Sequence, residues 1–109
     1  MSIAVAVLLA PMALSEVDFS RDVQPLLAAK CFACHGRDGA SRKAGLRLDL
    51  LETATAQRRR GAAIVPGDPG ASVLLSRVSA SNPEDRMPPG DHAPLTIAEI
   101  DLLRTWIAQ

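Results

Sequence analysis

The sequence predicts a small helical domain, because three segments carry apolar residues at helical spacing and no strand-rich alternation occurs. The chain has 109 residues, which is enough for one domain. Its net charge is zero, and this balance argues against nucleic acid as a partner. The aromatic residues are few, namely Phe19, Phe32 and Trp106. A domain of this size with so few large side chains has difficulty filling a core.

Residues 3–14 form an apolar run that resembles the core of a secretory signal peptide. The run is shorter than the roughly 20 residues of a membrane-spanning helix, and Pro11 interrupts it, so no stable membrane span is expected. Small side chains near its end place the expected cleavage after Ser15, which divides the chain into a leader over 1–15 and a domain over 16–109. No Lys or Arg precedes the run, so a buried helix of the folded domain is the alternative.

The first helix of the domain is expected from Ser20, as its capping residue, to about Lys30. Asp22 is favourable in its first turn, where a negative charge faces the positive end of the helix dipole. The apolar face of this helix consists of Phe19, Val23, Leu26 and Leu27. Pro25 has no backbone donor, so the helix is expected to be kinked there or to begin nearby.

The five residues Cys31-Phe32-Ala33-Cys34-His35 read C-x-x-C-H, the attachment signature of a c-type heme. Two thiols separated by two residues on one helical turn match the spacing of the two heme vinyl groups. The imidazole that follows at once then lies under the iron as the proximal axial ligand. The motif therefore predicts one covalent heme c, bound by Cys31 and Cys34, with His35 as a ligand of the iron. A buried heme would also supply the apolar volume that the scarce aromatic residues leave missing.

Three alternatives compete with heme at this motif. A dithiol redox motif of the thioredoxin type belongs to a strand–helix alternation, and the sequence has none. A zinc ion would strain the adjacent Cys34 and His35, and no second pair of cysteines completes such a site. A disulfide between Cys31 and Cys34 would close only a very small loop.

The middle of the chain carries weaker patterns. Residues 42–49 alternate polar with apolar side chains, which leaves open a short extended stretch or a turn of helix, and residues 50–57 are a weak helix candidate. The run Arg58-Arg59-Arg60 usually indicates a solvated face, with a docking patch or a heme propionate contact as the alternative. Arg47 and Arg77 are further propionate candidates, and a solvated arginine is the simpler interpretation of both.

A proline- and glycine-rich loop over residues 64–70 precedes the next expected helix. Either Asp68 or Ser72 is expected to cap that helix. Its apolar side consists of Val73, Leu74, Leu75 and Val78.

The last helix begins with the capping box Thr96-Ile97-Ala98-Glu99. Its apolar stripe consists of Ile100, Leu103, Trp106 and Ile107. We expect this stripe to pack across the first helix, near Phe19 and Val23.

Met87, in the loop between the last two helices, is the expected distal ligand of the iron. A thioether is a soft, neutral ligand that favours ferrous iron relative to a second histidine, so a His/Met pair raises the reduction potential. Pro88 and Pro89 stiffen the loop beside it. The alternatives are a methionine that fills a gap in the core, His92 as the ligand, or an open sixth position.

Five separated motifs together resemble the planctomycete-type cytochrome c domain, and the resemblance extends from about Val17 to Gln109. The motifs are Asp22–Leu27, Cys31–Gly36, Arg42–Asp49, Val65–Pro69 with Ser72, and Arg86–Pro89. The resemblance implies an all-α, class I-like cytochrome c fold. It also implies heme attachment at Cys31 and Cys34, with His35 as the proximal and Met87 as the distal ligand.

The resemblance also bears on the partners and location of the protein. Such a domain commonly opens a much longer extracytoplasmic protein, so the chain is expected to be exported to the periplasm or beyond. Redox partner proteins or further domains of the same chain are the expected partners. The sequence carries no signal of an oligomeric state.

The expected function is the transfer of one electron at a time, and not an enzyme activity of the domain itself. Two filled axial positions leave no room for substrate. The sequence also has no Ser/His/Asp array, paired carboxylate site or phosphate loop. The alternatives are a heme-based sensor or peroxidase-like domain with an open or displaceable sixth ligand, and a heme-less binding module in which the motif is vestigial.

Overall fold

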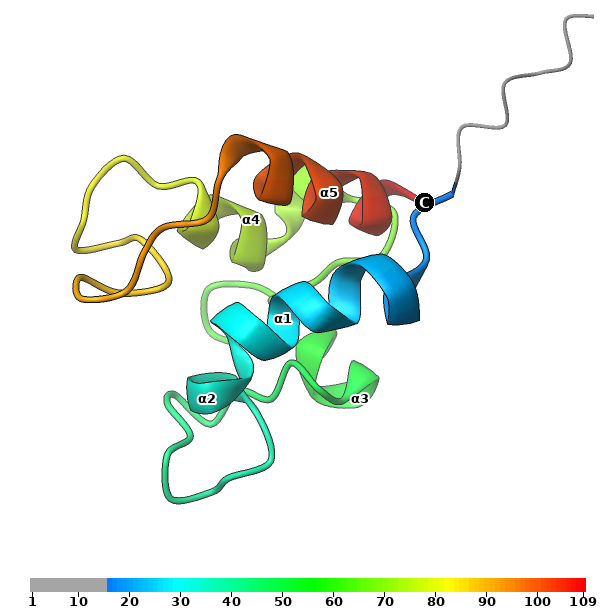
Figure 1. The fold of residues 1–109 in the computed structure, drawn as a ribbon. Coiled ribbons are helices and arrows are strands. Elements are labelled where there is room, and N and C mark those ends of the chain that lie inside the picture. Colours follow the sequence, from blue (N-terminus) through cyan, green and yellow to red (C-terminus); the bar gives the residue numbers. More distant parts are fainter. Residues whose placement is uncertain (1–15) are drawn as a thin grey trace, which may run out of the picture.

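A computed structural model describes residues 16–109, and every regular element within them is helical (Figure 1). In chain order the elements are η1 (Phe19–Val23), α1 (Gln24–Lys30), α2 (Phe32–His35), α3 (Leu51–Ala54), η2 (Pro69–Ala71), α4 (Val73–Val78) and α5 (Ile97–Ala108). The predicted helical fold class is therefore confirmed for this part of the chain. None of these helices is long and apolar enough to cross a membrane. The predicted leader over 1–15 lies outside the described residues.

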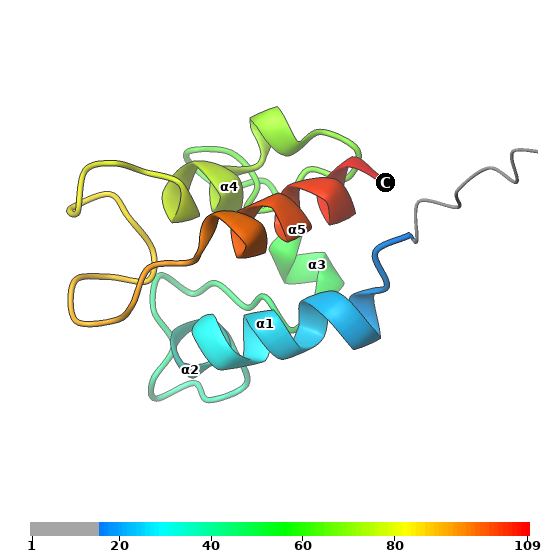
Figure 2. The same cartoon turned by 45° about the horizontal axis from the view of Figure 1, so that its top comes forward.

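Helices α4 and α5 contact one another, and both lie on the same side of α1 (Figures 1 and 2). Helix α5 contacts η1, where the rings of Phe19 and Trp106 lie with their centroids 5.4 Å apart. Val23, Leu103 and Ile107 are buried in the same core. The expected packing of the last helix near Phe19 and Val23 is confirmed.

The first helical segment begins at Phe19, one residue before the predicted capping residue Ser20. Asp22 bonds the start of this turn instead, because its carboxylate accepts a hydrogen bond of 2.9 Å from the backbone N–H of Asp18. The guanidinium of Arg21 also donates to this carboxylate, at 2.9 and 2.7 Å, and lowers the pKa of Asp22 from 3.8 to about 2. The prediction that Ser20 caps the helix is wrong, whereas the favourable place of Asp22 in the first turn is confirmed.

Pro25 explains why the first segment changes its winding. The segment opens as a wide π-helical turn and becomes an α-helix at Gln24. Pro25 thus lies in the first turn of α1. Proline is tolerated at this position of an α-helix although it has no backbone N–H to donate. The expectation that a helix begins properly near Pro25 is confirmed.

Helix α5 begins with the predicted capping box. The hydroxyl of Thr96 accepts a hydrogen bond from the backbone N–H of Glu99 at 3.1 Å, and the Glu99 carboxylate accepts one from the N–H of Thr96 at 2.8 Å. Leu103 and Ile107 of the predicted stripe are buried, and Ile100 and Trp106 pack against the core from its edge. Both predictions for this helix are confirmed.

The side chain of Gln109 joins the two ends of the described chain. Its carbonyl accepts a hydrogen bond from the backbone N–H of Val17 at 2.8 Å, and its amide donates to the Val17 carbonyl at 3.0 Å. The segment before η1 and the end of α5 therefore lie together (Figure 1).

Ser72 is the N-cap residue of α4, which confirms one of the two predicted positions, but its side chain makes no capping hydrogen bond to the helix. The hydroxyl of Ser72 is buried, accepts a hydrogen bond from the backbone N–H of Val65 at 2.8 Å, and donates to the Asp68 carbonyl at 2.9 Å. Asp68 caps the short turn η2, where its carboxylate accepts from the N–H of Ala71 at 3.1 Å. The side chains of Ser72 and Asp68 thus bond backbone groups of the loop before α4, and not the first N–H groups of the helix.

Residues 42–49 form neither of the two structures that the sequence left open. They form an irregular segment with one turn, in which Ala44 and Gly45 lie in the left-handed region at φ of 53° and 66°. Leu46 and Leu48 still point toward the core, where Leu48 is buried. The weak helix expected over 50–57 is confirmed only as the single turn α3.

Candidate heme site

The C-x-x-C-H motif forms one helical turn directly after α1. The backbone N–H of Cys31 donates to the carbonyl of Leu27 at 2.8 Å, which continues α1 into the motif. The N–H groups of Cys34 and His35 both donate to the Cys31 carbonyl, at 3.2 and 2.8 Å. Both cysteines are free thiols, so they are not joined in the disulfide that was one of the alternatives.

Gly36 lets the chain turn sharply after the motif. A Cβ atom at this position would lie far inside van der Waals contact with the backbone oxygen of Phe32. Only glycine therefore fits there without a shift of the backbone.

Two backbone bonds connect the motif to the loop that follows it. The N–H of Lys43 donates to the carbonyl of Cys34 and the N–H of Leu48 donates to the carbonyl of His35, each at 2.7 Å. These bonds bring the loop over residues 36–50 against the motif, although the loop has no regular structure of its own.

A cavity of about 960 Å³ opens beside the motif. Its volume lies near the upper end of the range of roughly 300–1,000 Å³ that ligand pockets occupy. The predicted heme-binding and ligand residues that line it are Cys31, Cys34, His35 and Met87, together with the alternative ligand His92. Apolar side chains supply much of the remaining wall, including Leu46, Leu48, Ala63, Leu74 and Val78.

The charged residues that line this cavity are all basic: Lys30, Lys43, Arg58, Arg59, Arg60 and Arg77. No Asp or Glu lies in its wall within the described part of the chain. A protein with zero net charge thus gathers positive charge around one cavity. Such a lining favours a ligand that carries anionic groups.

His35 has the properties of a metal-binding imidazole. Burial lowers its pKa, while nearby backbone groups of Leu46 and Lys43 act in the opposite direction. A neutral ring, which binds metal ions, is therefore favoured. Its Nδ1 atom is buried without a hydrogen-bond partner. The motif, the cavity and the basic lining together fit a heme.

The two thiols differ in their surroundings. Burial, and to a smaller degree Cys34, raises the pKa of Cys31 from 9.0 to about 11, so this side chain is a neutral thiol at physiological pH.

No group of three or more His, Cys, Asp or Glu side chains lies together within residues 16–109, so a tetrahedral zinc ion finds no further protein ligands there.

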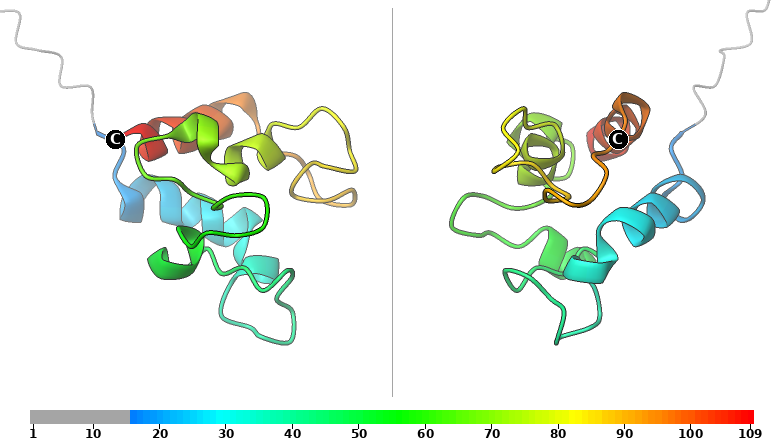
Figure 3. Two further views of the ribbon diagram at one scale, coloured as in Figure 1. Left: turned by 180° about the vertical axis from the view of Figure 1, so that it is seen from behind. Right: turned by 60° about the vertical axis from the view of Figure 1, so that its left-hand side comes forward.

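The segment that carries Met87 is fastened to α4. The backbone N–H of Met87 donates to the carbonyl of Arg77 at 3.0 Å, and the peptide bond between Met87 and Pro88 is cis. His92 follows in a turn closed by its own N–H and the Pro89 carbonyl, at 2.9 Å. Figure 3 shows this loop, in yellow and orange, at the same end of the molecule as α2.

The two arginines predicted as propionate contacts lie in different places. Arg77 lines the cavity, and its guanidinium donates to the Asp85 carbonyl at 3.3 Å. Arg47 does not line the cavity, and its guanidinium makes two hydrogen bonds to the carboxylate of Asp49, at 3.0 and 2.6 Å.

The basic lining extends beyond the arginines that the sequence singled out. The run over residues 58–60 had two interpretations, and all three of its arginines line the cavity. Lys30 and Lys43 were missed. Lys30 directly precedes the motif in the sequence, and this adjacency was the available signal.

Comparison with known proteins gives one match. No curated protein and no solved structure matches this chain. The model of a family described as Planctomycete cytochrome C matches residues 31–91, which is more than half of the 109 residues. The match begins at Cys31 and includes Met87, and it is narrower than the range from Val17 to Gln109 over which the sequence resembles that family. The chain therefore belongs to the planctomycete cytochrome c family, a family of heme-binding, electron-transfer domains.

Proposed function

We propose that this domain carries one electron at a time on a single heme c, attached through Cys31 and Cys34 and ligated by His35 and Met87. Family membership supports heme binding and electron transfer in general. The observation that carries the specific proposal is that these four side chains line one cavity of about 960 Å³.

Each residue has a distinct task in this proposal. Cys31 and Cys34 would hold the porphyrin covalently, and His35 and Met87 would be the ligands of the iron. A bound heme supplies a one-electron ferric/ferrous couple. The neutral thioether of Met87 favours the ferrous form and so raises the potential. With two ligands from the protein, the iron would have no site free for a substrate, which is why we propose no enzyme activity for the domain itself.

The remaining lining controls solvent and charge. Apolar side chains such as Leu48 and Leu74 keep water from the porphyrin face, which tunes the potential. The heme carboxylates need cationic partners, and Arg77 is a candidate because it lines the cavity. We assign no such contact to Arg47, because its guanidinium is bonded to Asp49 outside the lining.

We further propose that the domain acts outside the cytoplasm. Domains of this family are typically extracytoplasmic, and the apolar run over residues 3–14 supports export. Its electron donor and acceptor are then other redox proteins or further domains of the same chain.

The first test is the heme content of the protein made in a host with cytochrome maturation machinery. The expected product retains one heme per chain after denaturing electrophoresis, because only covalently bound heme survives that step. A colourless product, or two hemes per chain, contradicts the proposal.

The second test concerns the distal ligand. Met87→Ala is expected to lower the reduction potential and to let carbon monoxide bind the reduced protein, because it opens the sixth position. His92→Ala is the matched control, since His92 lines the same cavity from the same loop, and it is expected to change neither property. The reverse pattern assigns the distal ligand to His92. Carbon monoxide binding by the unaltered protein at neutral pH favours a sensor or a peroxidase-like domain.

A further inference from the structure

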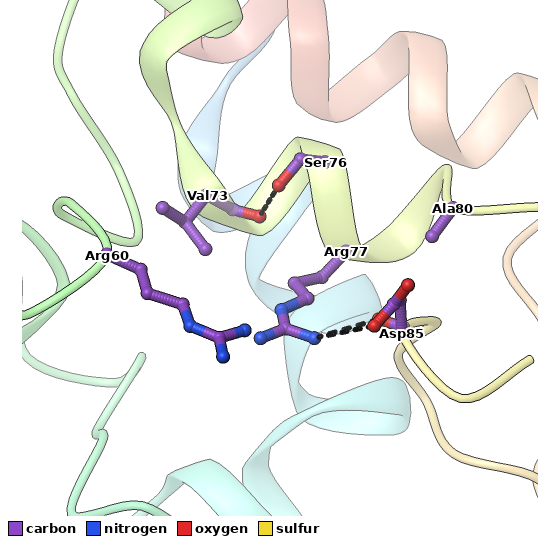
Figure 4. A pocket seen from close by; sticks show the side chains of 6 residues that line it. All are labelled: Arg60, Val73, Ser76, Arg77, Ala80 and Asp85. Atoms are coloured by element: carbon purple, nitrogen blue, oxygen red, sulfur yellow. Dashed lines mark hydrogen bonds and ion pairs between the residues drawn. The ribbon is translucent and has the colours of Figure 1, made fainter. Parts of the chain in front are cut away.

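A second, smaller cavity of about 450 Å³ adjoins the first near α4. It is lined by Arg60, Val73, Ser76, Arg77, Ala80 and Asp85 (Figure 4). Arg60, Val73 and Arg77 also line the larger cavity, so these side chains form the boundary between the two.

Two arginine side chains line this boundary. Figure 4 shows Arg60, from the loop after α3, and Arg77, from α4, with their guanidinium groups directed toward one another. Like charges that the fold brings together repel each other, unless an anion lies between them.

The acidic group beside this pair neutralises it only in part. The carboxylate of Asp85 lies 3.9 Å from the guanidinium of Arg77, and its side chain is 61% exposed. Arg60 has no acidic partner within 4 Å and no hydrogen bond from its guanidinium among the described residues. Two positive charges thus face one solvated negative charge, and a net positive charge remains.

We propose that Arg60 and Arg77 form a binding site for an oxyanion, of the carboxylate or phosphate type. Planar guanidinium groups donate pairs of hydrogen bonds that match two oxygens of such a group. Because the two arginines come from different segments, one anion held by both also joins the loop after α3 to α4.

The oxyanion can come from two sources that share this chemistry. One source is a heme propionate that enters from the larger cavity, in which case the inference rests on the proposed function. The other is a free anion such as inorganic phosphate, which enters from solvent through the smaller cavity. Its binding does not depend on a heme.

The experiment compares Arg60→Gln and Arg77→Gln with Arg59→Gln, each as the heme-loaded protein. Arg59 is a matched control, because it neighbours Arg60 and lines the larger cavity but not the smaller one. Arg77 also bonds Asp85, so Arg60→Gln carries the test alone if Arg77→Gln misfolds.

The first arm measures the thermal unfolding midpoint as inorganic phosphate replaces chloride at constant ionic strength. If the ligand is a free anion, phosphate raises the midpoint of the unaltered protein and of Arg59→Gln to a plateau. Arg60→Gln and Arg77→Gln then lose most of this rise.

The second arm measures the reduction potential as a function of pH. If the ligand is a propionate, phosphate has no effect, and removal of either guanidinium raises the pKa of that carboxyl. The inflection in the curve then moves to higher pH in Arg60→Gln and Arg77→Gln, by about one pH unit, which is a tenfold change in the proton affinity. Arg59→Gln keeps the inflection of the unaltered protein.

Other groups around the two cavities also titrate or carry charge. They are Asp85, Lys30, Lys43, Arg58, Arg59, His35, His92 and the thiols of Cys31 and Cys34. The two arginine variants are therefore also made with Asp85→Asn. If the inflection of the reduction potential still moves to higher pH, the titrating group is a heme carboxylate. If the inflection no longer moves, a propionate is not the ligand.

The proposal is overturned if phosphate has no effect and if both variants match Arg59→Gln at every pH. A heme stain of the same samples keeps this outcome separate from a failure of the proposed function. A chain without heme contradicts electron transfer, whereas the phosphate arm still tests the anion site.

Discussion

Helix α5 packs directly on η1 at the start of the first helical segment, whereas the segments around the large cavity are connected by individual backbone bonds. In the helical half, Leu27 and Leu103 are fully buried and Phe19 contacts Trp106. In the cavity half, the irregular loop over 36–50 is joined to the motif by two such bonds, those from Lys43 and Leu48. The loop that carries Met87 is joined to α4 by bonds to Arg77.

This difference leads us to expect that the two halves draw their stability in part from different sources. Side chains of the chain itself fill the helical half. The cavity half surrounds about 960 Å³, so we expect its order to depend on a ligand of that size. Four predictions test this division, from the largest expected effect to the smallest.

The double variant Cys31→Ser, Cys34→Ser is expected to lose all covalent heme. Amide hydrogen exchange should then accelerate strongly in the loops over 36–50 and 79–95, and much less in α1 and α5. Ala33→Ser is the matched control, because Ala33 lies between the two cysteines and is exposed. Equal acceleration in both halves would show that the heme stabilises the whole domain.

Leu103→Ala should lower the free energy of unfolding of the heme-loaded protein by about 2–5 kcal/mol, because Leu103 is fully buried in the helical half. Denaturant unfolding measures this loss, and the reduction potential of the folded protein should stay unchanged. Ile97→Ala, at a position of α5 that is 81% exposed, should have almost no effect. A change in potential as large as that of Met87→Ala would contradict the division.

Thr96→Ala should lower the free energy of unfolding by about 1 kcal/mol, because it removes the side-chain half of the capping box of α5. Thr105→Ala, at an exposed position of the same helix, serves as the control in the same denaturant titration. If both variants cost the same, the capping box adds no stability of its own.

Protonation of Asp22 in acid should lower the stability of the helical half. The guanidinium of Arg21 holds the pKa of this carboxyl near 2, below its ordinary value of 3.8. The stability that Asp22 contributes is therefore complete above pH 3.8 and is lost as the pH falls toward 2. Asp22→Asn should remove this part of the acid sensitivity in thermal unfolding curves, and an unchanged curve between these two pH values would refute the assignment.

The parts of the fold that rest on neighbours in the sequence could be predicted. The capping box needs only Thr96 and Glu99, and the heme motif needs one turn of five consecutive residues. The helical stripes were also predictable, because their spacing is a property of the helix itself.

The parts that rest on the folded loops could not be predicted in the same way. A serine hydroxyl can cap a helix, but the hydroxyl of Ser72 accepts a hydrogen bond from the backbone N–H of Val65. Val65 comes near Ser72 only because the loop between them folds back. Ala44 adopts a left-handed conformation that alanine seldom takes, so no local signal marked that turn. The meeting of Arg60 with Arg77 likewise depends on how the segment after α3 lies against α4.

The hydrogen bonds between the side chain of Gln109 and the backbone of Val17 have a consequence for how the domain can be linked to others. These two hydrogen bonds keep Val17 and Gln109 together, at the end of the molecule opposite α2 and the Met87 loop (Figure 1). A tether, tag or neighbouring module joined at either point would therefore emerge from one place. It would leave the mouth of the cavity free to approach an electrode or a redox protein.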